Sequence, residues 1–167
     1  MFSLVINEGK ETKTEKILKG LLKNNGESVK IGHFSDSGIH PDSNISFVDL
    51  MKYHSAGDPS KKIPSRPVLE ILVTSMLKVT AHKQVANALR RFKVNGFDRK
   101  ALEIMLKDIG EAIGEEEVNI FGSHRLAANA QKTKDLKGSE TPLVDTQDLV
   151  REVSYKDSIT KKPHKIL

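Results

Sequence analysis

The apolar residues of this chain recur mostly at helical spacing, and the most regular stretch begins at Asp98. Asp98 can cap a helix, and Gly114, which is followed by three glutamates, marks a possible end. The pattern between these two residues predicts an amphipathic helix. Its apolar face consists of Leu102, Met105, Ile109 and Ile113, and its charged face of Lys100, Glu103, Lys107 and Glu111.

A longer helical pattern runs from Pro67 to about Lys93. Proline is well tolerated in the first turn of a helix, so Pro67 fits the start. Such a start, apolar on nearly every side, predicts deep burial against several elements or against neighbouring chains. The apolar positions of this first half are Val68, Leu69, Ile71, Leu72, Val73, Met76, Leu77 and Val79.

Shorter patterns complete a mixed fold. Helical spacing also appears at residues 12–26 and, with Ser46 as its cap, at residues 47–57. Short apolar or alternating runs predict strands at residues 2–6, 28–34 and 149–155. The sequence therefore predicts an α+β fold in which a small, mostly antiparallel sheet packs on a long central helix, with extended loop arms.

The chain is interpreted as a single domain over residues 1–160. Residues 118–145 show no periodicity, which predicts a long irregular arm. Residues 161–167 form a basic tail that is expected to be frayed.

Composition narrows the function. The 167 residues include no cysteine and no tryptophan, so a thiolate nucleophile is excluded and a surface for stacking bases is not expected. The net charge of +5 suits a nucleic-acid binder, but also a protein that only contacts acidic partners. No apolar run approaches the roughly 20 residues of a membrane span, and the N-terminus lacks a secretory signal, so we expect no membrane partner and assembly in the cytoplasm.

One pair of residues raises the question of catalysis. Asp145 and Thr146 resemble the Asp-Thr-Gly loop of an aspartic protease, whose two carboxylates share a proton. Gln147 occupies the glycine position, however, and a homodimeric protease of that class is nearly all β, whereas this chain is strongly helical. We interpret Asp145 and Thr146 as turn-forming residues whose side chains bond nearby backbone N–H groups.

Other candidate sites carry little signal. Asp36, His40 and Asp42 share one loop and could ligate a metal, but residues of these types often gather in turns. Ser123 and His124 are adjacent, which prevents the geometry of a nucleophile and its base, and no phosphate-binding glycine loop is present. The sequence thus predicts a protein that is not an enzyme and has neither metal nor cofactor.

Two segments together carry a more specific signal. Residues 63–69 read IPSRPVL and open the long helical pattern, and residues 137–155 read KGSETPLVDTQDLVREVSY. This ordered pair resembles the neck and tail-completion proteins of tailed bacteriophages, often called minor tail or virion-morphogenesis proteins. That family has Ile-Pro-Ala-Arg-Pro-Phe-Leu before its central helix and Lys-Pro-Leu-Ile-Asp-Thr-Gly-x-Leu before a strand. Val68 stands at the position of the family's common phenylalanine, and Gln147 at that of its usual glycine.

The resemblance implies a structural virion protein that is a subunit of the neck or tail-completion ring joining head and tail. It implies a homo-oligomeric ring, a hexamer, that contacts the adjacent head–tail connector, tail-terminator or tail-tube rings. The basic residues could face DNA in the lumen or acidic surfaces of adjoining rings. The alternative is a basic nucleic-acid-binding protein without an assembly role. The residues expected to form the subunit interface or the family motif are Ile63, Pro64, Arg66, Pro67, Leu69, Leu72, Pro142, Leu143, Asp145, Thr146 and Leu149.

Overall fold

The computed structural model describes residues 19, 26–76, 79–94, 98–129, 134–135, 141–143 and 147–167. The predicted strand at residues 2–6 lies outside this part of the chain, as does the predicted helix at residues 12–26 apart from Lys19 and Gly26. Most of the predicted arm beyond residue 129 also lies outside it.

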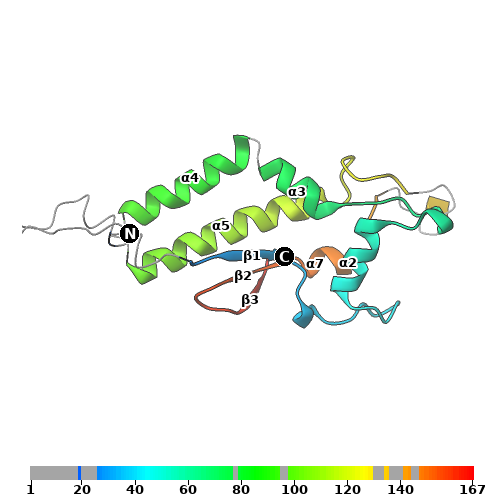
Figure 1. Ribbon diagram of the computed structural model, residues 1–167, viewed down its shortest axis with the longest axis horizontal. Coiled ribbons are helices and arrows are strands. Elements are labelled where there is room, and N and C mark those ends of the chain that lie inside the picture. The colour runs from blue at the N-terminus through cyan, green and yellow to red at the C-terminus, as the bar shows by residue number, and fades with distance from the viewer. Residues whose placement is uncertain are drawn as a thin grey trace, which may run out of the picture.

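Two long helices and a small sheet form the main body of the fold (Figure 1). Helices α4 (Val79–Val94) and α5 (Arg99–Ile120) lie side by side, and the sheet packs on α5. The sheet consists of β1 (Val29–Gly32), β2 (Ser154–Asp157) and β3 (Pro163–Lys165) in that order.

The sheet is antiparallel throughout, with Ile31 opposite Tyr155 and Tyr155 opposite His164. The α+β prediction of an antiparallel sheet on a long helix is therefore confirmed, and that helix is the 22-residue α5. The expectation of a frayed C-terminal tail is wrong. Residues 163–165 pair with β2, and the Ile166 amide donates to the Val153 carbonyl at 3.1 Å.

Helix α5 begins where the sequence predicts but ends later. The Asp98 side chain accepts a hydrogen bond from the Ala101 amide at 2.6 Å, which confirms the cap. The predicted end at Gly114 is wrong, because the helix continues to Ile120. Gly110 and Gly114 instead face the sheet, where a Cβ on Gly110 would lie 2.5 Å from Cγ of Tyr155. These glycines let side chains of the sheet touch the helix backbone.

The long helical pattern at residues 67–93 forms two helices. Helix α3 (Val68–Met76) precedes α4, Leu77 and Lys78 between them lie outside the described residues, and the two helices point in different directions (Figure 1). The prediction of one helix is therefore wrong. Both helices contact α5, and the change of direction lets each place its own apolar face on it.

Two buried clusters form the core, and α5 contributes to both. The first cluster joins α3 and the end of α5 to helices α2 (Phe47–Ala56) and α7 (Asp148–Arg151). It contains Phe47, Met51, Val68, Leu72, Ile120, Phe121, Leu126, Leu149, Val150 and Val153. The second lies between α4 and α5 and contains Phe92, Ala101, Leu102 and Leu106.

The remaining predictions are confirmed for α2 and only partly for the last strand. The Ser46 hydroxyl accepts from the Asp49 amide at 3.1 Å, and Gly57 ends α2 at a positive φ of 70°. The strand predicted at residues 149–155 is β2 only from Ser154 onward, and its first residues form α7. Leu149 and Val150 are buried there by helical rather than by strand packing.

Candidate functional site

Arg66 of the first motif segment lies just before α3 and is only 6% exposed. Its Nε donates to the Ala127 carbonyl at 2.8 Å, and one terminal nitrogen donates to the Ala128 carbonyl at 3.1 Å and to Oδ1 of Asn129 at 3.2 Å. The side-chain Nδ2 of Asn129 then donates to the Thr141 carbonyl at 3.2 Å. A continuous line of hydrogen bonds therefore joins the first motif to the residue that precedes Pro142.

The first motif is also fastened to the end of α2. The Arg66 amide donates to the His54 carbonyl at 2.8 Å, and the Ser65 hydroxyl donates to the Ser55 carbonyl at 2.5 Å. The backbone of Ser65 packs directly against Gly57. A Cβ at position 57 would lie 2.6 Å from the Ser65 amide nitrogen, so only glycine leaves room for this contact. Ile63 pairs with Asp58 in an isolated β-bridge. Residues 63–67 are thus a shaped connection between α2 and α3.

The second motif contributes to the same core. The Pro142 carbonyl accepts from the Gly122 amide at 3.0 Å, and Leu143 packs on the first core cluster. Leu149 lies within that cluster together with Leu72 of α3. The described motif residues therefore mainly define the fold. Asp145 and Thr146 lie outside the described residues, so their interpretation as turn residues stays a prediction.

Gln147 has an unusual backbone conformation. It immediately precedes α7 and has a φ of 64°, in the left-handed region that favours glycine. Gln147 therefore places a side chain in a backbone conformation that glycine adopts freely, at some cost in strain.

One motif residue lies on an exposed apolar face of α3. Val68 and Leu72 are buried, but Leu69 is 45% exposed and Val73 is 59% exposed. Leu69 and Val73 are four residues apart, so they share one face of the helix. Among the described residues of this helix start, Val68 and Leu72 are therefore covered within the chain, whereas Leu69 and Val73 are not.

A buried acid–imidazole pair lies beside the first core cluster. Glu117 of α5 is completely buried, and within the described part of the chain neither of its carboxylate oxygens has a hydrogen-bond partner. Nδ1 of His33 lies 3.9 Å from Oε1 of Glu117, and Nε2 of His33 lies 2.7 Å from the Leu149 carbonyl. An Nε2–H that donates to Leu149 leaves Nδ1 as a lone-pair acceptor facing Glu117.

Burial sets the protonation of this pair. It raises the pKa of Glu117 to about 7, and it lowers the pKa of His33, although the Leu149 carbonyl and the charge of Glu152 oppose that change. The pair is therefore most stable with Glu117 protonated and His33 neutral. It is enclosed and has no neighbouring nucleophile among the described residues, so it provides a titratable group in the core.

The position of Glu117 in the helical pattern of the sequence indicates that it faces the core. Glu117 lies four residues after Ile113 and three before Ile120, both on the core side of α5, so it occupies an apolar position of the helix. The expected helix end at Gly114 left Glu117 outside this pattern.

In the loop that was considered for metal binding, Asp36 and His40 contact charged side chains of other segments. Nζ of Lys156 lies 2.8 Å from both carboxylate oxygens of Asp36, and Nε2 of His40 lies 3.9 Å from Oδ2 of Asp148. Over the residues that the structure describes, no group of three or more His, Asp or Glu side chains is placed to hold a metal ion. None of the described helices combines the length and apolar character needed to cross a membrane.

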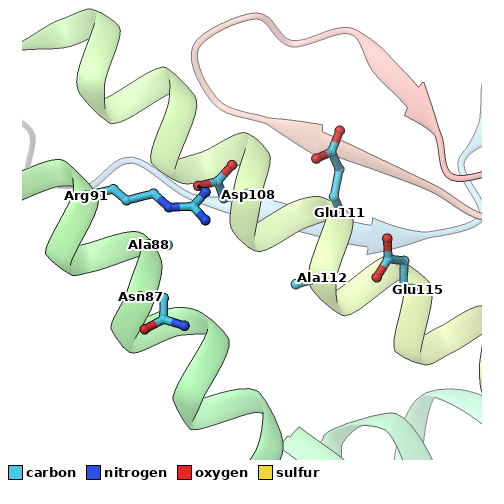
Figure 2. A pocket seen from close by; sticks show the side chains of 7 residues that line it. All are labelled: Asn87, Ala88, Arg91, Asp108, Glu111, Ala112 and Glu115. Atoms are coloured by element: carbon cyan, nitrogen blue, oxygen red, sulfur yellow. Dashed lines mark hydrogen bonds and ion pairs between the residues drawn. The ribbon is translucent and has the colours of Figure 1, made fainter. Parts of the chain in front are cut away.

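A groove separates α4 from α5 (Figure 2) and has a volume of about 210 Å³. Arg91 and Asp108 face each other across it and form an ion pair of 2.7 Å. Glu111 and Glu115 add negative charge along the α5 side. The lining residues are Asn87, Ala88, Arg91, Asp108, Glu111, Ala112 and Glu115. The groove is an acidic surface without an evident nucleophile.

Comparison with protein-family models, with curated proteins and with solved structures finds no match to this chain. The likeness to phage neck proteins therefore rests on the residues of the two motifs.

Replacing Arg66 with lysine is expected to lower the free energy of unfolding by roughly 1.5 kcal/mol, because one ammonium group at this buried position cannot bond the three acceptors that the guanidinium reaches. Urea denaturation measures the change, and faster amide exchange at residues 127–129 should accompany it. Arg90→Lys on the exposed face of α4 is the matched control, with an expected change within about 0.5 kcal/mol. Equal effects at the two positions would contradict the role of Arg66.

Proposed function

We propose that this protein is a structural virion protein, a subunit of the neck or tail-completion ring that joins head and tail of a tailed bacteriophage. The observation that carries the proposal is that both motif segments pack in the first core cluster and are linked by hydrogen bonds from Arg66 through Asn129 to Thr141. Two motifs that belong to one family should serve one structural unit, and here hydrogen bonds and shared packing join them. The protein has no catalytic role in this proposal.

The exposed face of α3 supports assembly into a ring. Leu69 and Val73 leave apolar surface in water beside a well-packed core, and burial of such surface by a neighbouring subunit would be favourable at about 25 cal/mol per Å². A closed ring repeats one contact between two different surfaces of the subunit. The partners are other copies of the chain and the rings above and below, in a virion assembled in the host cytoplasm.

The double substitution Leu69→Lys with Val73→Lys tests this face. We expect loss of the homo-oligomer in light scattering and, in a phage that carries the variant, separate heads and tails with infectivity lower by at least about 100-fold, since two buried charges would oppose the contact. The melting temperature should stay within about 3 °C of wild type, because both side chains are exposed in the single chain.

Ile39→Lys is the matched control, because Ile39 is 60% exposed, as much as Val73, and lies outside α3. It should leave oligomer and infectivity unchanged. Phage particles that keep normal tails without this protein would refute the proposed function, and normal particles with the α3 variant would refute the contact.

A further inference from the structure

Basic residues begin α5 and acidic residues lie near its end. Arg99 and Lys100 occupy the first turn, directly after the Asp98 cap, and the last turn contains no basic residue. Glu115 and Glu116 lie within the last two turns, and Glu117 is the buried carboxyl group described above. Cations at a helix N-terminus and anions at a C-terminus lower helix stability. Such an arrangement is expected where the charges serve a contact outside the helix.

The basic end of α5 lies next to the end of α4 (Figure 1). We call the exposed residues Arg90, Lys93, Arg99 and Lys100 the hairpin tip. In the described part of the chain, no ion-pair partner accompanies any of these four side chains. Arg91, by contrast, is paired with Asp108 inside the groove. The tip therefore presents unneutralised positive charge.

The acidic groove lies farther along the same two helices. Glu115 is exposed and has no ion pair within the described residues, and Glu111 has only a surface pair with Lys107 at 3.6 Å. Ala88 and Ala112 contribute only methyl groups to the lining. From Arg99 to Glu115 the helix rises about 24 Å, so the basic side chains at the start of α5 cannot reach Glu115 of their own chain.

We infer that the hairpin tip of one copy docks in the groove between α4 and α5 of the next copy. The two surfaces have opposite charge, they lie at different places on one rigid helix pair, and the groove is open to long basic side chains. A contact between two different surfaces of one subunit repeats head to tail and can close into a ring. This inference rests on the proposed function and adds a second surface to the contact made by α3.

Zero-length cross-linking detects this contact directly. A carbodiimide joins a lysine amine to a carboxylate only when the two touch, so Lys93 or Lys100 should become linked to Glu111 or Glu115. A mixture of ¹⁴N- and ¹⁵N-labelled wild-type protein, at high concentration and low salt, should give links between the two isotopes for these pairs. Absence of these links under conditions where the protein is oligomeric, or at the highest soluble concentration, would overturn the inference.

Charge reversal gives a stricter test. The tip variant is Arg99→Glu with Lys100→Glu, and the groove variant is Glu111→Lys with Glu115→Lys. Each alone presents two surfaces of like charge and should fail to assemble. A one-to-one mixture should recover assembly to within about twofold of wild type, with the two variants alternating, because each tip then meets a groove of opposite charge.

Stability separates this outcome from misfolding. All four substituted side chains are exposed, so neither variant should melt more than about 2 °C below wild type. Lys52→Glu with Lys61→Glu changes the net charge as much as the tip variant, at exposed positions in other elements, and should assemble normally. Assembly of either reversed variant alone, or no recovery in the mixture, would overturn the inference.

The outcomes also distinguish a nucleic-acid role. If the tip serves DNA, the tip variant should lose salt-sensitive binding to duplex DNA while both variants assemble as wild type, and that result would overturn docking between copies. Failure of the charge reversal would leave the proposed ring function standing, since that function is tested by particles lacking the protein and by the α3 face.

Discussion

Replacing Gly110 with alanine is expected to lower the free energy of unfolding by at least roughly 2 kcal/mol, although the same change inside an exposed helix usually stabilises by about 1 kcal/mol. The added Cβ would lie 2.5 Å from Cγ and 2.9 Å from Cε2 of Tyr155. Tyr155 is only 2% exposed and stacks on the ring of His164 at 4.8 Å, so it has little room to move away. Thermal and urea unfolding measure the effect.

Gly114→Ala is the matched control on the same face of α5. Its Cβ would meet the outer atoms of the Ile166 side chain, which is half-buried and can change rotamer. We expect a change within about 1 kcal/mol of zero. Tyr155→Leu in the Gly110→Ala background should recover part of the loss, as a coupling between residues in contact. If Gly110→Ala stabilises the protein, the packing of β2 on the helix backbone is wrong.

Glu117→Gln is expected to change how stability depends on pH. The wild-type pKa rises from an ordinary value of 4.5 to about 7 through burial, so the folded state holds this proton more tightly than the unfolded state. The stabilisation that proton binding provides is fully present below about pH 4.5 and is lost as the pH rises to about 7. Above that pH the wild type carries an unpaired buried carboxylate, which glutamine removes.

The expected size follows from the same shift. Between 4.5 and about 7 the stability of the glutamine variant relative to wild type should rise by roughly 3 kcal/mol and then stay level. The pKa of His33 is lowered, chiefly by burial, so its contribution has the opposite sign: it is present above about pH 6.5 and is lost on acidification. The two slopes offset each other in wild type, and the glutamine variant should lose stability more steeply below about pH 6.5.

Urea unfolding at several pH values tests this expectation. Glu115→Gln, at an exposed position of the same helix, is the control and should show a pH profile parallel to wild type. A constant difference between Glu117→Gln and wild type across the range would mean that Glu117 is not buried as a titrating carboxyl group. That result would remove the acid–imidazole pair from the account of the core.

The sequence by itself determined the features that depend on neighbouring residues. The cap at Asp98, the cap at Ser46 and the stop at Gly57 follow from side chains and backbone preferences within one turn of a helix. The α+β class follows from the mixture of helical and alternating patterns. The two motifs were also visible in the sequence, but their link through Arg66 and Asn129 was not.

Only the tertiary structure decided the features that depend on contacts between distant segments. Gly114 reads as a helix stop, yet α5 continues because Tyr155 and Ile166 pack where side chains at positions 110 and 114 would lie. Residues 149–151 were predicted to begin a strand, yet they belong to α7 because that helical turn buries Leu149 and Val150 in the first core cluster. Glu117 was expected at the end of the helix, yet it lies within α5 and is buried. Periodicity records which face of an element is apolar, whereas the partner that covers this face is set by packing among residues far apart in the chain.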